Sequence, residues 1–409
     1  MLFRASWTAA RRPGTLEAMR TSHPGDVLLT GATGFVGTAL LARLVRPPYE
    51  RRVWALVRAA DDEQAAARVR AALAPLVADL DAACERVVAV AADLQQPWLG
   101  LDGRQAETLS RWVTDVIHAA ASVSFSLPLE EARAINVEGT RRLLDRAARC
   151  ASSGSGLRRF AHVSTAYVAG THRGRFREDD HDVGQGFHNT YEQTKWEAER
   201  LVRAQAERLP VQVLRPSIVV GDETTGWTSS FNVIYTPLRA YARGALPVVP
   251  ARRGAPVDVV PVSYVAEAIA ALALGDAGEC RTYHLTASEQ ASNVAELIAL
   301  SARRLDRRPL RTLPPRLYGA AVHPVLLARS SGATRRWLQR ADVFFPYLAA
   351  RVRFDAARAR AALGAPPPLA AYFDTLIDYA ESVDWGRAPV PAAPAPLADG
   401  RPAARPAVA

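Results

Sequence analysis

No stretch of this 409-residue chain reaches the roughly 18 to 20 consecutive apolar residues that a membrane-spanning helix needs. The most apolar stretch, residues 262–274, is interrupted by Glu267 and predicts an amphipathic helix packed on a core. Residues 1–24 carry four arginines and no clean apolar segment, which disfavours a secretory signal. We therefore expect a cytoplasmic protein without a transmembrane segment.

Cysteine is scarce, and its few positions exclude two classes of site. Cys84, Cys150 and Cys280 are odd in number and far apart, so neither a disulfide framework nor a paired-cysteine metal site is predicted. The eight histidines include no HExxH motif or other close pair. The sequence thus predicts no metal centre and fits a reducing compartment.

Lysine is almost missing. The chain has 51 basic residues, and Lys195 is the one lysine among them. Arginine is a planar cation that stays charged, whereas the pKa of a lysine can be lowered for proton transfer. A position that has kept lysine in so arginine-rich a chain therefore indicates that its ammonium chemistry is needed.

The net charge of +10 first suggests a nucleic-acid partner, but the arginines are scattered, with no long basic run and no aromatic RNA-binding motif. We therefore predict no nucleic-acid binding. A diffuse positive field favours small anionic ligands, such as nucleotide or coenzyme A phosphates, or an acidic carrier protein. A solvated arginine surface without any partner fits the composition equally well.

Strand-like and helix-like segments alternate from residue 26 onward. The predicted strands are residues 27–30, 53–57, 87–91, 113–118, 160–163 and 211–214. The predicted helices are residues 35–45, 63–80, 136–147 and 191–208. This alternation predicts an α/β fold, a doubly wound (Rossmann) parallel sheet with helices on both faces.

The chain divides into four predicted parts. Residues 1–24 are expected to be a disordered extension, in which Met19 is an alternative start, so translation of residues 1–18 stays open. Residues 25–285 are expected to form the dinucleotide-binding domain, with elements of a smaller substrate-binding lobe from about residue 222. Residues 286–385, with helices at 293–305 and 335–351, are expected to complete that lobe, and residues 386–409 to form a disordered Ala/Pro-rich tail.

A glycine-rich turn follows the first predicted strand. Residues 30–37 read TGATGFVG, with glycines at Gly31, Gly34 and Gly37. Such glycines allow a tight turn, close approach of the backbone to a pyrophosphate, and tight packing of helix on strand. The turn predicts dinucleotide binding, with Thr33, Phe35 and Val36 completing the loop.

The end of the second strand predicts which dinucleotide binds. Arg58 follows directly, where an arginine accepts a ribose 2′-phosphate, and Arg68 is a second candidate contact, so NADP is favoured. Asp61 and Asp62 lie close by and keep NAD open as the alternative. Past the third strand, Asp93 and Leu94 are candidate adenine contacts, and a plain turn is the other interpretation.

Lys195 lies four residues after Tyr191 on a predicted helix, so the two side chains share one face. A nearby ammonium favours the phenolate form of a tyrosine. Ser164 and Thr165 end an earlier strand, where a hydroxyl can donate to a substrate carbonyl oxygen. A surface pair and an ordinary strand end remain the alternative interpretation.

These motifs together resemble the extended short-chain dehydrogenase/reductase superfamily. More narrowly, residues 162–168 (HVSTAYV), 215–222 (RPSIVVGD) and 257–261 (VDVVP) resemble the branch of fatty acyl-CoA reductases (male-sterility type) and thioester reductase domains. So do Val57-Arg58 and residues 118–121 (HAAA) followed by Phe125. Residues 353–355 (RFD) are similar to the C-terminal region of the acyl-CoA reductases.

The resemblance implies roles for individual residues. It implies Tyr191 as proton donor, Lys195 as its partner, and Thr165 rather than Ser164 as the catalytic hydroxyl. The remaining implied cofactor contacts lie at the nicotinamide (Pro216, Ser217, Ile218) and along the cofactor cleft (Ala119, Ala120, Ala121). Ala92 departs from the branch, whose members commonly have glycine before the aspartate.

The implied activity is NADPH-dependent reduction of an acyl thioester, bound to coenzyme A or to a carrier protein, to an aldehyde or alcohol. Residues 335–351 are then expected to form a core-packing helix broken at Pro346, and the alternatives are a cap on an acyl channel or a peripheral membrane contact. Other candidate functions are a sugar-nucleotide epimerase or dehydratase, a hydroxysteroid dehydrogenase, and a non-catalytic NADP-binding protein. Acyl chain length and oligomeric state stay open.

Overall fold

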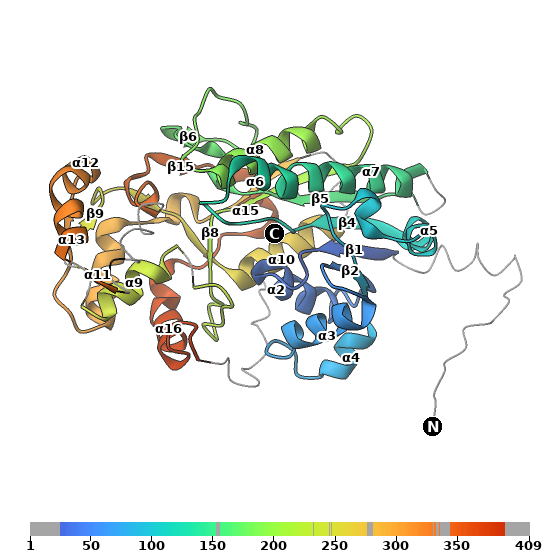
Figure 1. The fold of residues 1–409 in the computed structure, drawn as a ribbon, viewed down its shortest axis with the longest axis horizontal. Coiled ribbons are helices and arrows are strands. Elements are labelled where there is room, and N and C mark those ends of the chain that lie inside the picture. The colour runs from blue at the N-terminus through green and yellow to red at the C-terminus, as the bar shows by residue number, and fades with distance from the viewer. Residues whose placement is uncertain are drawn as a thin grey trace, which may run out of the picture.

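Seven parallel strands form the central sheet of the computed structural model (Figure 1). The strands are β1 (Asp26–Thr30), β2 (Val53–Val57), β3 (Val87–Ala91), β4 (Val113–His118), β5 (Arg159–Val163), β7 (Val211–Pro216) and β12 (Thr282–Leu285). Their order is β12-β7-β5-β4-β1-β2-β3, and every pairing is parallel. The order reverses between β1 and β4, and in such sheets ligands bind at the carboxyl ends of the strands beside that point. The predicted doubly wound fold is confirmed.

The structure describes residues 25–152, 156–231, 233–244, 246, 248–275, 281–329, 331–332, 335 and 344–388. The predictions for residues 1–24, for residues 389–409 and for residues 336–343 fall outside these ranges.

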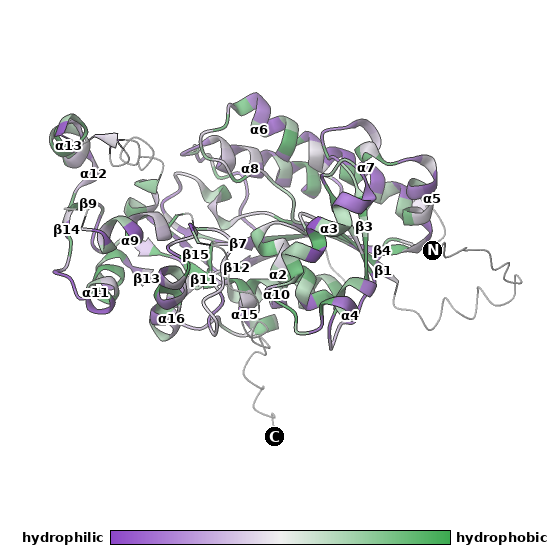
Figure 2. Cartoon of the chain, turned by 60° about the horizontal axis from the view of Figure 1, so that its bottom comes forward, coloured by the Kyte–Doolittle hydropathy of each residue, from purple (hydrophilic) through white to green (hydrophobic). Residues whose placement is uncertain are grey.

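Alternating apolar side chains bury both faces of the sheet. From β1, Val27 and Leu29 pack in one buried cluster and Leu28 packs in the other. Helices α2 (Phe35–Leu44), α3 (Asp62–Leu73) and α10 (Val262–Leu274) cover the first face. Helices α5 (Gly103–Trp112), α7 (Glu138–Ser152) and α8 (Thr190–Arg203) cover the second face. Figure 2 shows the hydrophobic strands lying between helices whose outer faces are more hydrophilic.

Three predicted helices differ in extent from the observed ones. The helix predicted at 63–80 is two helices, α3 and α4 (Leu80–Glu85), because Pro75 removes a backbone donor and clashes with the preceding turn. The helix predicted at 136–147 is α7, preceded by a separate α6 (Leu129–Asn136). Helix α8 ends at Arg203, five residues before the predicted end.

Whereas β12 joins the central sheet and α10 covers one of its faces, most elements after β7 form a smaller lobe, seen at the left of Figure 1. Its strands are β8 (Ile218–Val220), β9 (Val248–Pro250), β10 (Pro256–Val257), β11 (Val259–Pro261), β13 (Ser292–Asn293) and β14 (Arg311–Leu313). Its helices are α9 (Tyr235–Ala242), α11 (Val294–Arg304), α12 (Pro315–Leu317), α13 (His323–Arg329) and α16 (Leu369–Ser382). Helix α15 (Ala357–Leu363) packs beside β12 of the sheet instead. Much of the lobe packs around its own buried cluster, which includes Phe373 and Ile377.

The predicted helix at 335–351 is wrong over its described end. After Pro346 the chain forms only a short 3-10 turn, Tyr347–Ala349, and continues into β15 (Val352–Phe354). Strand β15 pairs in parallel with β6 (Gly174–Phe176) and so ties this segment to the body of the protein. Tyr347 is buried, as expected for a segment that packs on the core.

The segment expected to be a tail begins with three residues that fold back. The backbone amides of Gly386, Arg387 and Ala388 all donate to the carbonyl of Val383 at the end of α16. Within the described ranges, no helix combines the length and apolar character needed to cross a bilayer.

Candidate active site

The glycine turn sits at the point where the strand order reverses, between β1 and α2. Gly31 has φ +76°, a conformation that side chains rarely adopt, and a Cβ there would lie 2.7 Å from the backbone nitrogen of Ala120. A Cβ on Gly37 would overlap the carbonyl oxygen of Gly31. The turn is therefore closed by backbone-to-backbone contact that only glycine allows.

This turn has the chemistry that a pyrophosphate needs. Helix α2 starts after Gly34, and its first turn contains no acidic residue. Its first amides thus present partial positive charge without a competing carboxylate. Ala119 and Ala120 run beside the turn, their amides donating to the carbonyl of Thr30 (3.3 Å) and to its hydroxyl (3.2 Å). Phe35 lies over Trp227 of the lobe, with 5.7 Å between ring centroids.

After β2, the two candidate arginines and the two nearby aspartates have different surroundings. Arg58 and Arg68 are exposed and adjacent, since the guanidinium of Arg68 donates to the carbonyl of Arg58. Asp61 accepts from the amide of Gln64 (2.8 Å) as the cap of α3. Asp62 accepts from the amide of Ala91 (2.7 Å) on β3. Both carboxylates therefore already have backbone partners, whereas Arg58 faces solvent.

Asp93 and Leu94 follow β3 in a turn. The Asp93 carboxylate accepts from the amide of Gln95 (2.9 Å), and the Leu94 carbonyl accepts from Arg142 (3.0 Å). These bonds match the turn interpretation of Asp93, and both residues stay partly exposed beside the carboxyl end of the sheet.

Thr165, Tyr191 and Lys195 meet at the carboxyl end of β5. The Thr165 hydroxyl lies 3.5 Å from the carbonyl oxygen of Pro216 and hydrogen-bonds with the phenol of Tyr191. Asn189 caps α8 by accepting from the Glu192 amide (3.0 Å), which places Tyr191 in the first turn. One turn further, Lys195 Nζ donates to the carbonyl of Val163 (2.8 Å).

Burial shapes the acid–base properties of this set. Burial raises the pKa of Tyr191 to about 12, so the phenol keeps its proton at neutral pH. Burial lowers the pKa of Lys195 to about 8, and the nearby Glu199 carboxylate opposes that shift. Two histidines lie under the lysine with pKa values lowered mainly by burial: His118, to about 3, and His162, well below its usual value.

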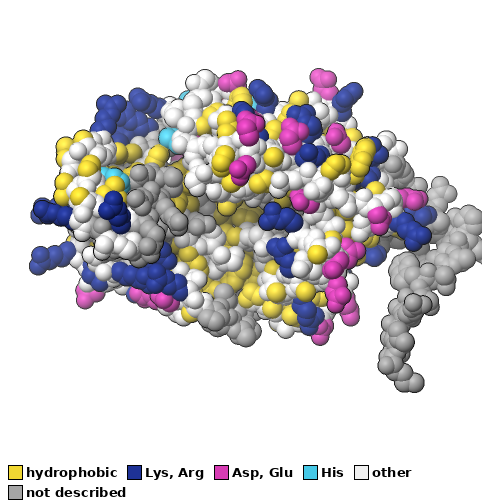
Figure 3. Space-filling view, viewed as in Figure 1, with side chains coloured by type: hydrophobic (Ala, Val, Ile, Leu, Met, Phe, Trp, Pro, Cys, Tyr) yellow, Lys and Arg dark blue, Asp and Glu magenta, His cyan; other side chains and the backbone are white. Residues whose placement is uncertain are grey.

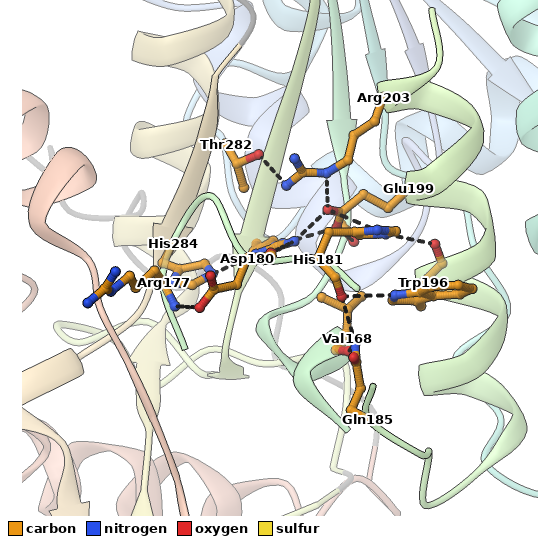
Figure 4. Close-up of polar contacts among 12 residues, drawn as sticks. Val168, Arg177, Asp180, His181, Gln185, Trp196, Glu199, Arg203, Thr282 and His284 are labelled. Atoms are coloured by element: carbon orange, nitrogen blue, oxygen red, sulfur yellow. Dashed lines mark hydrogen bonds and ion pairs between the residues drawn. The ribbon is translucent and has the colours of Figure 1, made fainter. Parts of the chain in front are cut away.

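Ser164 points away from the hydroxyls of Thr165 and Tyr191. Its hydroxyl donates to Glu199 (2.8 Å), a carboxylate buried between α8 and β7. Glu199 also accepts two bonds from Arg215, a fully buried arginine on β7. Figure 4 shows the surrounding network, in which Arg203 and His181 approach this carboxylate. Around them, Thr282 accepts from Arg203, Trp196 donates to the carbonyl of His181, and His284 contacts Arg215. Of the two strand-end hydroxyls, the one on Thr165 contacts Tyr191.

The segment between β7 and β8 lies against Thr165. The carbonyl oxygen of Pro216 accepts a hydrogen bond from the Thr165 hydroxyl. The amide of Ser217 donates to the carbonyl of Leu285 (3.2 Å) at the end of β12. Ile218 and Ser217 are buried. Figure 3 shows a hollow lined mainly by hydrophobic side chains between the sheet-bearing half and the lobe. The predicted glycine loop, hydroxyls and strand ends thus all lie at the carboxyl ends of the sheet's strands.

Sequence reasoning missed an aromatic and polar group around Tyr191. The Phe125 ring lies between the rings of Tyr191 (5.7 Å) and Tyr347 (5.5 Å). The Tyr347 hydroxyl donates to Glu192 (2.7 Å) and accepts from Asn189 (2.9 Å). Asparagine just before the Tyr–Lys helix was a readable cap signal. Nothing local points to Tyr347, which is more than 150 positions away.

Asn136 was also missed. It is buried at the end of α6, where its amide nitrogen donates to Thr194 on α8 (3.0 Å) and its oxygen accepts from the Ser122 amide (2.8 Å). It therefore fixes the loop after β4 against the helix that carries Tyr191 and Lys195. Among the residues that the structure places, no cluster of histidine, cysteine and carboxylate side chains is suited to a metal ion.

A doubly wound sheet, a glycine cradle at its switch point and a buried Thr–Tyr–Lys set define a dinucleotide-dependent oxidoreductase of the short-chain dehydrogenase/reductase class. The NAD-binding family described as male sterility protein matches residues 29–269. The chain belongs to this family, and it is an oxidoreductase whose cofactor is NAD(P).

Similar known proteins indicate which members of this family the chain resembles. The terminal R domain of the myxalamid PKS-NRPS pathway is 30% identical, with a TM-score of 0.76 over 90% of this chain and 93% of that domain. The peptide synthetase FrzA of Cladobotryum sp is 29% identical over 76% of this chain, which spans 32% of FrzA. Fatty acyl-CoA reductase 1 of Xenopus laevis is 32% identical over 59% of this chain and 52% of that protein. This chain thus spans only a third to a half of these two curated relatives.

Sugar-nucleotide enzymes share the fold alone. MoeE5, solved with UDP-glucuronic acid and NAD, is 23% identical with a TM-score of 0.60.

Proposed function

We propose that this protein reduces an acyl thioester with NADPH, releasing an aldehyde and a thiol. The observation that carries the proposal is the match, along nearly the whole chain, to the terminal R domain of a polyketide and peptide synthetase pathway. The same chain resembles a fatty acyl-CoA reductase, so the thioester is held either by a carrier protein or by coenzyme A.

The positions of the charged groups favour NADPH over NADH. Asp61 and Asp62 each accept a backbone amide, so neither is positioned as a dedicated partner for a ribose 2′-hydroxyl. Arg58 is exposed at the end of β2 with Arg68 against its carbonyl, and a guanidinium pairs well with a 2′-phosphate. The glycine cradle and the first amides of α2 would hold the pyrophosphate.

In this proposal the bound cofactor supplies a hydride to the thioester carbonyl carbon, and the protein's side chains handle the oxygen. Thr165 and Tyr191 donate hydrogen bonds to that oxygen, and Tyr191, protonated at neutral pH, gives it a proton. The buried Lys195 ammonium stabilises the Tyr191 phenolate that remains, and it passes a proton to that phenolate to restore the phenol. The resulting hemithioacetal breaks its C–S bond, and the hydroxyl proton passes to the departing thiolate, which gives the aldehyde and the free thiol.

The balance of the first step is thioester plus NADPH plus one proton, giving aldehyde, thiol and NADP⁺. A second equivalent of NADPH and another proton would give the alcohol. The same donors at the carbonyl oxygen serve both steps.

The test is NADPH oxidation with a panel of acyl-CoA and acyl-carrier thioesters of different chain length, with products identified by mass spectrometry. We expect turnover with at least one thioester and an aldehyde or alcohol product. Absence of turnover with every thioester, together with retained NAD in the purified protein, would instead favour a sugar-nucleotide epimerase.

A further inference from the structure

The proposed reaction needs three elements to meet with atomic accuracy. Thr165 lies two residues beyond the end of strand β5, strand β7 ends at Pro216, and helix α8 carries Tyr191 and Lys195. One side chain touches all three elements. Glu199 lies on α8, one turn beyond Lys195, and is fully buried.

The carboxylate of Glu199 divides its bonds between the two strands. Oε2 accepts from the Ser164 hydroxyl (2.8 Å) and from Arg215 Nε (3.0 Å). Oε1 accepts from Arg215 Nη2 (2.6 Å). Ser164 directly precedes Thr165, and Arg215 directly precedes Pro216. Each partner is therefore the chain neighbour of a residue that lines the reaction site.

Arg215 is itself held in one orientation. Its Nη1 contacts Nε2 of His284 (3.0 Å), and its Nη2 donates to the carbonyl of Asp180 (2.7 Å). Nδ1 of His284 lies 2.7 Å from the carbonyl of Asp355, so Nδ1 carries the proton and Nε2 accepts from Arg215. Because Glu199, Arg215 and His284 are all buried, a bidentate pair of this kind fixes position as well as charge.

We propose that Glu199 is a positioning residue for the reduction, which aligns Thr165 and Pro216 with Tyr191 and Lys195 through Ser164 and Arg215. This rests on the proposed function. The arrangement also gives Ser164 a role as a positioning residue, distinct from that of the catalytic hydroxyl on Thr165.

The chain supplies a matched control in Arg203. Its Nε donates to Glu199 Oε1 (2.8 Å) from the outer side, its other end bonds to Thr282 (2.7 Å), and its side chain is 30% exposed. Arg203 thus contacts the same carboxylate without reaching the strand ends that carry Thr165 and Pro216.

The first experiment compares Ser164→Ala with Arg203→Ala. We expect kcat to fall about 5- to 20-fold in Ser164→Ala, in the range of one neutral or charge-assisted hydrogen bond, with the KM for NADPH within about twofold. We expect kcat within about twofold of wild type in Arg203→Ala. Wild-type kcat in Ser164→Ala, or equal losses in both variants, would overturn the proposal. A loss above a thousandfold in Ser164→Ala would make Ser164 a catalytic residue instead.

The second experiment measures pH profiles of Glu199→Gln. The charged or titratable groups facing Lys195 are His118 on β4, His162 on β5, and Tyr191 and Glu199 on its own helix, with Arg215 on β7 behind Glu199. Removing the carboxylate lowers the pKa of Lys195 further. The alkaline fall in kcat should therefore move to lower pH, whereas a merely structural loss would lower kcat with no change in that position. An unmoved profile would contradict the proposal.

Cofactor affinity separates this proposal from the proposed function. Fluorescence titration with NADPH needs no turnover, and it should show binding weakened by about tenfold or more in Glu199→Gln, because the strand end beside the nicotinamide is released. Arg203→Ala should bind as wild type. If no thioester is reduced by the wild type, the proposed function fails while this comparison still decides the positioning role. If Glu199→Gln does not fold, Ser164→Ala decides it alone.

Discussion

Lys195 combines two properties that rarely meet in one side chain: it is 3% exposed, and it carries a proton with a pKa of about 8. Because burial in the folded chain lowers this pKa, the ammonium is present below pH 8 and is lost as the pH rises through that value. Tyr191, with a pKa of about 12, stays protonated over the same range. The pH dependence of the reduction should therefore report on the lysine.

Replacing Lys195 by arginine tests this directly. In the wild type we expect kcat/KM to be level at neutral pH and to fall above about pH 8, as the ammonium loses its proton. In Lys195→Arg we expect a rate lower by about a hundredfold or more and no fall near pH 8, since a guanidinium stays charged. Initial rates between pH 6 and 10 check both. An arginine variant with wild-type rates would remove the catalytic assignment.

Arg58 is the residue on which the choice between NADPH and NADH depends. In Arg58→Ala we expect the KM for NADPH to rise by about tenfold or more, because a charge-assisted bond to the 2′-phosphate is lost, and the KM for NADH to change by less than about twofold. Arg70→Ala is the control, because Arg70 lies on the same helix as Arg68 and pairs with Asp81. Equal changes for both cofactors would argue against a 2′-phosphate contact.

At the scale of elements, the turn between β1 and α2 is specified by steric exclusion. Gly37 is the third residue of α2. Because it has no side chain, the helix can pack directly against the carbonyl of Gly31. The same turn touches the backbone of Ala119 and Ala120 after β4. A side chain here would have to separate the helix from the strand.

We therefore expect Gly37→Ala to destabilise the protein by about 1 to 3 kcal/mol, the range for overpacking, and to weaken NADPH binding by more than about tenfold. Gly103→Ala is the matched control. Its Cβ would meet nothing within 4 Å at the start of α5, so stability should be unchanged or higher by up to about 1 kcal/mol. Urea unfolding and cofactor titration compare the two variants. Normal cofactor affinity in Gly37→Ala would refute the close packing.

Some elements are specified by residues close together in the sequence, and others by contacts between distant residues. The strands and the glycine turn were predictable because apolar runs and glycine spacing act over a few residues. The end of the helix predicted at 335–351 was not, because Tyr347 is placed by Asn189, Glu192 and Phe125, all distant in sequence. In the candidate site, spacing and resemblance were enough to predict that Tyr191, Lys195 and Thr165 lie together. The role of Ser164 was not predictable in this way, because its direction depends on Glu199 across the fold.

At the scale of the whole molecule, the lobe and the sheet share one buried cluster. Trp227, Ala356, Ala359 and Tyr379 pack with Val27 and Leu29 of β1 in a single group of buried side chains. The dinucleotide-binding half and the lobe are therefore not independent in stability, although the lobe also has a cluster of its own.

We accordingly expect a single cooperative thermal transition, with calorimetric and van't Hoff enthalpies in agreement. NADPH at a hundred times its dissociation constant should stabilise the whole chain by about 2.7 kcal/mol and shift that one transition upward. Differential scanning calorimetry with and without NADPH measures both. Two transitions, of which NADPH moves only one, would show that the lobe unfolds separately.

The scarcity of lysine has a practical consequence. Since Lys195 holds the one ε-amine of the chain and lies in the candidate site, growth on lysine labelled with ¹⁵N at the ε position would place a single isotopic label in the protein. A heteronuclear NMR spectrum would then contain one side-chain amine signal, needing no assignment. Its chemical shift across a pH series would read the protonation of the Lys195 amine directly, with or without ligand.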